Sequence, residues 1–132
     1  MYDLPAGEPG YRNAISDAVR AGADAIMVTS NPDAFENRVL ITGLIGQARR
    51  PAVYAEYEFA EAGGLMAYGA DFLELSRRAA GDIDAILRGT KPGDIPFFGG
   101  QRFKLTINLK TAKALGLTVP QSLLALANEV IE

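Results

Sequence analysis

The sequence has no cysteine, no histidine and no tryptophan. Without cysteine there is no disulfide, no thiolate nucleophile and no Cys-His zinc site, and without histidine there is no Ser-His-Asp triad. The absence of cysteine does not assign a compartment, because such a domain is compatible with oxidising and reducing surroundings alike. A carboxylate-only metal site stays chemically open, but no segment has the spacing of a calcium-binding loop. We therefore expect no metal ion, no cofactor and no catalysis of these kinds.

Long apolar runs and nucleotide-binding loops are also missing. No run approaches the roughly 20 residues that span a bilayer. The opening residues, MYDLPAGEPGYRN, lack the basic and apolar regions of a signal peptide, so we expect no export signal in this chain. There is no G-x-x-x-x-G-K-[ST] loop and no G-x-G-x-x-G after the first predicted strand. The net charge of -3 argues against a nucleic-acid partner, because phosphate binding favours a basic face.

The composition is that of one ordinary globular domain. The chain has 132 residues, of which 48% are hydrophobic and 22% charged, enough for a single core. We expect one α/β domain over residues 1–132. Proline and glycine are frequent in residues 1–10, which predicts a flexible start, and again in residues 90–101, which predicts a hinge-like connection.

Short apolar runs alternate with helical patterns along the chain. Strands are predicted at Ala25–Val28, Val53–Ala55 and Leu65–Tyr68. Strands that alternate with helices indicate βαβ units, so we expect these three to be parallel neighbours in a sheet flanked by helices. A fourth strand, Phe103–Leu109, alternates between apolar and polar residues, which predicts one wet face and an edge position. Helices are expected over residues 11–21, 33–48, 71–88, 110–115 and 118–131, with a short one ending at residue 62.

The stretch EFAEAGGLMAYGADFLELSRRAAG, residues 58–81, organises the rest of the chain. Its run Leu65–Tyr68 is apolar throughout, which is typical of a strand buried on both faces. Tyr68 and Asp71 lie at the carboxyl end of that strand, where open α/β sheets bind ligands. An equally good interpretation is that Asp71 only caps the next helix and Tyr68 only packs.

Polar and aromatic side chains gather where the three predicted strands end. The candidate ligand-binding residues are Ser30, Asn31, Tyr54, Glu56, Tyr57, Tyr68 and Asp71. Asp71 or Glu56 suits an ammonium group, because a charge-assisted hydrogen bond is strong. Ser30 and Asn31, with nearby helix N-terminal amides, suit a carboxylate. The tyrosine rings suit an apolar or aromatic side chain.

This set predicts a site for a small polar or zwitterionic ligand. The competing interpretation is that these are solvated turn residues on a structural domain, because polar residues are common where loops begin. Glu56 and Glu58 alternate along a strand end and point apart, which makes them a poor general acid/base pair. We expect no catalytic residue.

Two long segments resemble a known family. They are PAVYAEYEFAEAGGLMAYGADFLELSRRAAGDIDAILRGTKPGDIP, residues 51–96, and FKLTINLKTAKALGLTVPQSLLALANEVIE, residues 103–132. Together they resemble the C-terminal part of bacterial ABC-transporter substrate-binding proteins of the tryptophan/tyrosine-binding (TrpX-like) type. The most specific motifs are EFAEAGGLMAYGAD and INLKTAKALGLTVP, and the resemblance extends over residues 24–132. The chain departs from the family pattern at residues 97–101.

The resemblance implies a fold, partners and a location. It implies a type I periplasmic-binding-protein fold, in which two α/β lobes joined by a hinge close on a solute. This chain corresponds to the second, C-terminal lobe and lacks the first. The implied partners are a small-molecule solute, the missing N-terminal lobe and, in the full-length form, an ABC permease with its ATPase. The implied location is periplasmic or lipid-anchored.

The same resemblance gives the helix over residues 72–87 a particular role. In the family fold this helix crosses the hinge and packs on the first lobe. Without that lobe its apolar stripe has no cover, so we expect the helix to be poorly buried and to support self-association. The stripe consists of Leu75, Ala79, Ile83, Ile86 and Leu87.

We therefore expect a solute-binding component of an ABC importer, not an enzyme, with an amino acid as ligand. One alternative is a flavodoxin-like α/β enzyme or regulatory domain. That class needs a phosphate loop or an acidic cluster at the first strand, and Thr29–Pro32 supplies neither. Another alternative is a truncated fragment without ligand function.

Overall fold

The computed structural model describes residues 7–97 and 102–132, so the expectations for residues 1–6 and 98–101 lie outside the described residues. By packing, the chain divides into two compact units. The first unit comprises the chain up to Gly69 together with Lys104–Glu132, and the second unit is Ala70–Phe103. The predicted domain thus consists of two units of packing, and its identity as one lobe stays a prediction.

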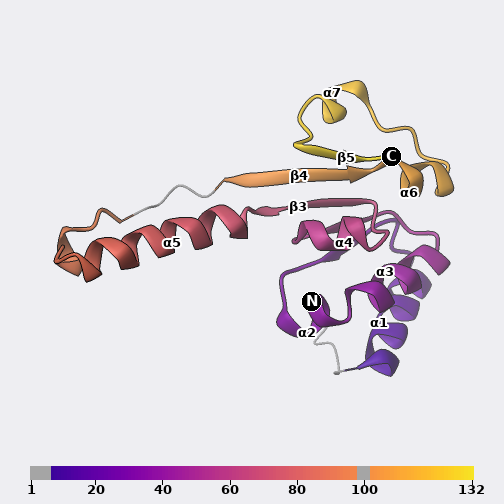
Figure 1. Cartoon of the computed structure of the whole chain (residues 1–132). Coiled ribbons are helices and arrows are strands. Elements are labelled where there is room, and N and C mark those ends of the chain that lie inside the picture. Colours follow the sequence, from indigo (N-terminus) through magenta and orange to yellow (C-terminus); the bar gives the residue numbers. More distant parts are fainter. Residues whose placement is uncertain (1–6, 98–101) are drawn as a thin grey trace. The chain divides into compact units, whose positions relative to one another are not determined.

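Within the described residues, five strands form one sheet, in the order in which they occur along the chain, and Figure 1 labels the last three of them. They are β1 (Ile26–Val28), β2 (Ala52–Tyr54), β3 (Met66–Ala70), β4 (Phe103–Asn108) and β5 (Glu129–Ile131). β1, β2 and β3 are parallel neighbours, as predicted. β5 lies parallel to β4.

β4 runs antiparallel to β3. The backbone N–H of Asp71 donates to the carbonyl of Arg102, and the N–H of Asn108 donates to the carbonyl of Leu65. Residue numbers therefore rise on one strand as they fall on the other. The predicted edge position of this strand is wrong, because β4 lies between β3 and β5 and its last four residues are buried.

The described residues of the first unit also form six α-helices, of which the first precedes β1 and the others lie between strands. The six are α1 (Glu8–Arg20), α2 (Pro32–Glu36), α3 (Arg38–Gln47), α4 (Tyr57–Glu61), α6 (Leu109–Ala114) and α7 (Gln121–Leu124). The flexible start predicted for residues 1–10 is wrong at its end, because α1 already begins at Glu8. Gly7 takes a φ of 91° before it, and Pro9 fits the first turn. The single helix predicted over residues 33–48 is broken at Asn37, where ψ is 16°.

The end of the chain differs most from expectation. The predicted helix over residues 118–131 is only one turn, and β5 follows it. Asn128 directs this change, because its backbone N–H donates to the Leu105 carbonyl while its side-chain Oδ1 accepts from the Leu105 N–H. These two bonds start a ladder against β4. Val130 and Ile131 then favour a strand because β-branched side chains suit the pleated conformation.

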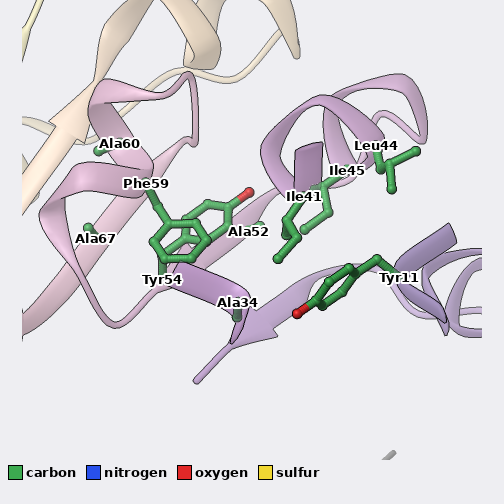
Figure 2. Close-up of a cluster of buried hydrophobic side chains, with 10 residues drawn as sticks. All are labelled: Tyr11, Ala34, Ile41, Leu44, Ile45, Ala52, Tyr54, Phe59, Ala60 and Ala67. Carbon is green, nitrogen blue, oxygen red and sulfur yellow. The ribbon is translucent and has the colours of Figure 1, made fainter. Parts of the chain in front are cut away.

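A hydrophobic core joins one face of β1–β3 to α1, α2, α3 and α4 (Figure 2). Tyr54 from β2 stacks on Phe59 from α4, with ring centroids 4.9 Å apart. Tyr11 lies on the far side of this cluster, beside Ile41 and Ile45 of α3. The core thereby fixes β2 and α4, and with them the loop that carries Glu56.

The second unit contains the long helix α5 (Phe72–Leu87) and a short 3-10 turn, Pro92–Asp94. Asp71 caps α5, because its Oδ1 accepts from the Glu74 N–H at 3.1 Å. No residue of α5 is buried, and Leu87 is 81% exposed. The expectation of poor burial along the apolar stripe is confirmed.

Candidate functional site

The parallel strands of the first unit end at one edge of the sheet. The register aligns Val28 of β1 with Tyr54 of β2, and Tyr54 with Ala67 of β3. Residues 29–31 and 55–57 therefore leave the sheet side by side. The loops that begin at this edge carry Ser30, Asn31, Glu56 and Tyr57, and their common role in binding a ligand stays a prediction.

Gly69 holds the ends of β2 and β3 unusually close. A Cβ atom at Gly69 would lie 1.6 Å from the carbonyl oxygen of Ala55, far inside contact distance. Only glycine permits this approach. The segment that carries Glu56 and Tyr57 is thus pressed against β3 next to Tyr68.

Glu56 is the most unusual residue at this edge. Its backbone is extended at the N-cap of α4, but its side chain does not cap the helix. The residue is 7% exposed, and its Oε2 atom is buried without a hydrogen-bond partner. A buried carboxylate oxygen without a partner is costly, so an ammonium or other donor at this oxygen would be strongly favoured.

Asn31 is partly committed to the fold. Its Oδ1 accepts hydrogen bonds from the N–H groups of Asp33 at 2.9 Å and Ala34 at 3.4 Å. The amides that open α2 are therefore engaged by Asn31 itself, in contrast to the expectation that they would face a carboxylate. The Asn31 amide nitrogen and the exposed Ser30 hydroxyl are donors in this loop.

Three tyrosines were predicted at the site, and the structure separates them. Tyr57 and Tyr68 are exposed, and the neighbouring Glu58 carboxylate raises the pKa of the Tyr57 phenol. Tyr54 is instead buried in the core against Phe59, and burial raises its pKa. In the structure Tyr54 packs in the core, so a contact between Tyr54 and a ligand is still only a prediction from the sequence.

Asp71 belongs to the second unit, where it also borders a hollow of about 330 Å³. The hollow is lined by Asp71, Glu74, Leu75, Arg77, Arg78 and Arg102. Glu74 and Arg102 approach within 3.8 Å. The three arginines were not predicted from the sequence, although Arg77 and Arg78 are adjacent in it. Their chemistry suits an anionic group.

The described residues contain neither a cluster of metal ligands nor a membrane-spanning helix. Over residues 7–97 and 102–132, no group of three or more acidic side chains is placed to hold a metal ion. The helices of these same residues include none that is both long and apolar enough to cross a bilayer.

Comparison with known proteins places this geometry in context. A family model described as ABC transporter substrate binding protein matches residues 13–131. No curated protein gives a significant match. Solved structures do: the ABC domain in complex with L-Trp from Streptococcus pneumoniae is 26% identical, with a TM-score of 0.81 over 95% of this chain.

Two other structures share the fold. A conserved domain protein from Vibrio cholerae is 24% identical with a TM-score of 0.80, and 93% of this chain is covered. The ligand-free, open form of a substrate-binding protein with adhesive properties from Clostridium difficile is 20% identical, with a TM-score of 0.67 over 95% of this chain. This chain spans only 41–42% of the three solved chains.

Proposed function

Because the chain belongs to the family of ABC transporter substrate-binding proteins, we propose that it contributes one lobe of a receptor that binds an amino acid for import. Its role is then one of binding rather than catalysis. Members of this family are periplasmic or extracellular, and we propose the same location for this chain. The amino-acid ligand is suggested by the L-Trp bound to the S. pneumoniae relative.

The observation that carries this proposal is the buried, unpartnered Oε2 of Glu56 at the carboxyl end of β2. An α-ammonium group at this oxygen would offset the cost of burying the carboxylate. Ser30 and the amide nitrogen of Asn31 are the proposed donors to the ligand carboxylate. Tyr57 and Tyr68 offer exposed rings to the ligand side chain. Asp71 remains a proposed contact whose observed function is to cap α5.

The proposed partners are the remainder of a binding protein and an ABC permease. The chain spans less than half of its solved relatives, and α5 leaves Ile83, Ile86 and Leu87 exposed. We propose that α5 packs on the first lobe where that lobe is present. Where it is absent, the same stripe supports self-association, because exposed apolar patches tend to be covered.

Isothermal titration with three ligands tests the proposed site. L-Trp has both charged groups, tryptamine keeps only the ammonium, and indole-3-propionate keeps only the carboxylate. We expect Glu56→Gln to weaken L-Trp and tryptamine by about 1.5–3 kcal/mol and to leave indole-3-propionate unchanged. Glu61→Gln is the matched control, since Glu61 is an exposed carboxylate at the other end of α4.

Two outcomes would contradict the proposal. Equal losses for tryptamine and indole-3-propionate would mean that Glu56 acts on the fold and not on an ammonium group. No binding of any amino acid by the wild-type chain, in titration and in a thermal-shift screen, would favour a chain without ligand function. A bound ligand at about one hundred times its dissociation constant should stabilise by about 2.7 kcal/mol, which a thermal shift detects readily.

A further inference from the structure

The apolar and small side chains of α5 have the spacing of a helix that packs along a second helix. Intervals of four and three residues alternate along one side of α5, which is the repeat of a coiled coil. The exposed residues at these positions are Phe72, Ser76, Ala79, Ile83 and Ile86. Leu73, Ala80 and Leu87 lie beside them, about two helical turns apart from one another, and are exposed too. We call these residues together the seam of α5.

Partial burial is confined to another side of α5. The half-buried residues of the helix are Glu74, Leu75, Asp82 and Ala85, and their helical spacing brings them to one side. On the seam, by contrast, Leu73 is 56% exposed and Leu87 is 81% exposed. The described residues therefore leave the seam uncovered, and an exposed apolar patch of this kind marks an interaction site.

Large and small side chains are distributed unevenly along the seam. Ile83, Ile86 and Leu87 are large, and the residues before them, at 76, 79 and 80, are serine and alanine. A parallel pair of such helices would set large residues against large ones and leave space beside the small ones. An antiparallel pair sets Ile83 of one helix against the small residues of the other, so the side chains interdigitate.

The charges beside the seam favour the same arrangement. Arg77 and Asp84 are both exposed and are about two helical turns apart, so they lie on the same flank of α5. In an antiparallel pair of helices each flank meets the same flank of the partner, which brings an arginine beside an aspartate. Asp84 already accepts from Arg88 of its own helix at 2.8 Å, but a carboxylate has room for a second donor.

The apolar and the charged pairs require one and the same register. Leu73 opposite Leu87, and Arg77 opposite Asp84, are each centred on Ala80 or the next residue. A two-fold axis at Ala80 therefore satisfies both pairs at once and repeats each of them on the other side of the axis. The small side chain at the axis also allows the two helices to approach closely.

We propose that two copies of this chain pair antiparallel along their α5 helices, with Ala80 at the two-fold axis and Arg77 of each copy beside Asp84 of the other. This pairing rests on the self-association proposed above, and it adds the orientation and the register of the partner. The seam is also part of the surface proposed to pack on the first lobe. Pairing of two copies and packing on a first lobe would then exclude each other.

Thiol cross-linking tests the orientation, because the wild-type chain has no cysteine. Ala80→Cys places one thiol of each copy at the axis, where a disulfide can close. Ser76→Cys keeps the side chain small, but in an antiparallel pair it separates the two thiols by about 12 Å along the helices. Gly81→Cys is the control for random collision, because Gly81 lies on the far side of α5 and a Cβ there meets nothing within 4 Å.

Under mild oxidation at micromolar concentration, we expect Ala80→Cys to form a disulfide-linked dimer about tenfold or more faster than the other two variants. Non-reducing electrophoresis measures the three rates. Equal rates for Ala80→Cys and Ser76→Cys, in variants that still associate, would indicate a parallel pair and overturn the proposal while self-association stands. Equal rates for all three variants would indicate random collision. A monomeric wild-type chain would overturn self-association as well.

Sedimentation velocity on charge variants tests the contact between Arg77 and Asp84. Arg77→Asp sets two carboxylates together at two symmetric places, and we expect it to raise the dissociation constant of the dimer about three- to tenfold. Combining it with Asp84→Arg restores opposite charges, so the double variant should associate nearly as well as the wild type. Arg12→Asp is the matched control, because it makes the same change of charge at an exposed arginine of α1.

Two results of the charge series would overturn the proposed register. One is an effect of Arg77→Asp no larger than that of Arg12→Asp. The other is a double variant that associates no better than Arg77→Asp alone. Both leave the proposed amino-acid site of the first unit untouched, because the titrations described above test that site separately.

Discussion

Gly69 is a residue whose replacement by alanine has no room in the structure. Its added methyl would meet the Ala55 carbonyl at 1.6 Å, and backbone atoms cannot move aside as a flexible side chain does. We expect Gly69→Ala to lower the free energy of unfolding by about 1–3 kcal/mol or more, because that is the usual cost of overpacking. Urea titration measures this loss.

Gly43→Ala provides the matched control for Gly69→Ala. Gly43 lies in α3, and a Cβ there would meet no other atom within 4 Å. Alanine favours a helix over glycine by up to about 1 kcal/mol, so this variant should be more stable than the wild type. Equal effects of the two substitutions would show that β2 and β3 are not held as closely as described.

Tyr11 makes stability depend on pH in alkali. Burial, then the hydrogen bond and the charge of Asp33, raise the pKa of Tyr11 to about 12, while an unfolded tyrosine titrates near 10. Since the folded value is the higher one, the contribution is complete below pH 10 and is lost as pH rises towards 12. The loss is about 1.4 kcal/mol for each unit between the two pKa values.

We expect Tyr11→Phe to flatten this alkaline fall in stability. At pH 7 the variant should lose only about 0.5–1.5 kcal/mol, the usual value of one hydrogen bond. Between pH 10 and 12 its free energy of unfolding should fall less steeply than that of the wild type, although buried Tyr54 keeps part of the slope. Parallel curves from urea titrations across this range would contradict the assignment.

At the scale of single residues, the sequence did not show which of the candidate side chains are buried. Glu56 and Tyr54 lie two positions apart near the end of one strand, and both were predicted to face a ligand. The structure buries Tyr54 against Phe59, because the face on which a side chain lies depends on where α4 packs. Residue type and spacing do not show which face of the strand α4 covers, so the burial of Tyr54 could not be predicted from the sequence.

The helix α5 exposes several large apolar side chains. Burying one leucine or isoleucine is worth roughly 1.5–3 kcal/mol, and Ile83, Ile86 and Leu87 of the stripe are all exposed. We expect the wild-type chain to associate at micromolar concentration and Ile83→Lys with Leu87→Lys to make it monomeric. Sedimentation velocity over a concentration series measures both.

The control for this double variant is Gly81→Lys. Gly81 lies on the opposite side of α5, and a Cβ there meets nothing within 4 Å. This variant adds one positive charge where the double variant adds two, and the apolar stripe stays intact, so association should persist. A wild-type chain that sediments as a monomer at every concentration would contradict self-association through the stripe.

At the scale of elements, the strand–helix alternation was enough to predict three parallel neighbours. The sequence pattern predicted a helix in place of the last strand, because Leu123, Leu124, Ala127 and Val130 have helical spacing. That spacing outweighed the β-branched pair at 130 and 131, which favours a strand. The prediction failed for β4 because an alternating pattern indicates one wet face only when nothing covers it. Here α4 contributes a carbonyl to the buried Asn108 side chain, which closes that face.

At the scale of the molecule, the pairing of β3 with β4 could not be read from the sequence. A helix of sixteen residues between two strands normally indicates a parallel crossover. In this chain the helix belongs to a unit of its own, so the strands on either side of it meet as antiparallel neighbours. The resemblance to a two-lobed family was the signal that this helix leaves the sheet before the chain returns to it.

Because β3 and β4 are antiparallel, a short turn could replace the segment between them, residues 72–101. Asp71 and Arg102 face each other across a backbone hydrogen bond, which is the position where a two-residue hairpin turn fits. Replacing residues 72–101 by Asn-Gly should therefore give a shorter, monomeric chain that keeps the sheet and melts cooperatively. Circular dichroism and calorimetry would follow this, with Ala-Ala in place of Asn-Gly as the control that lacks the turn preference. A molten product from both replacements would mean that the first unit needs residues 72–101 in order to fold. A folded product would mean that residues 72–101 are an insertion into a sheet that folds without them.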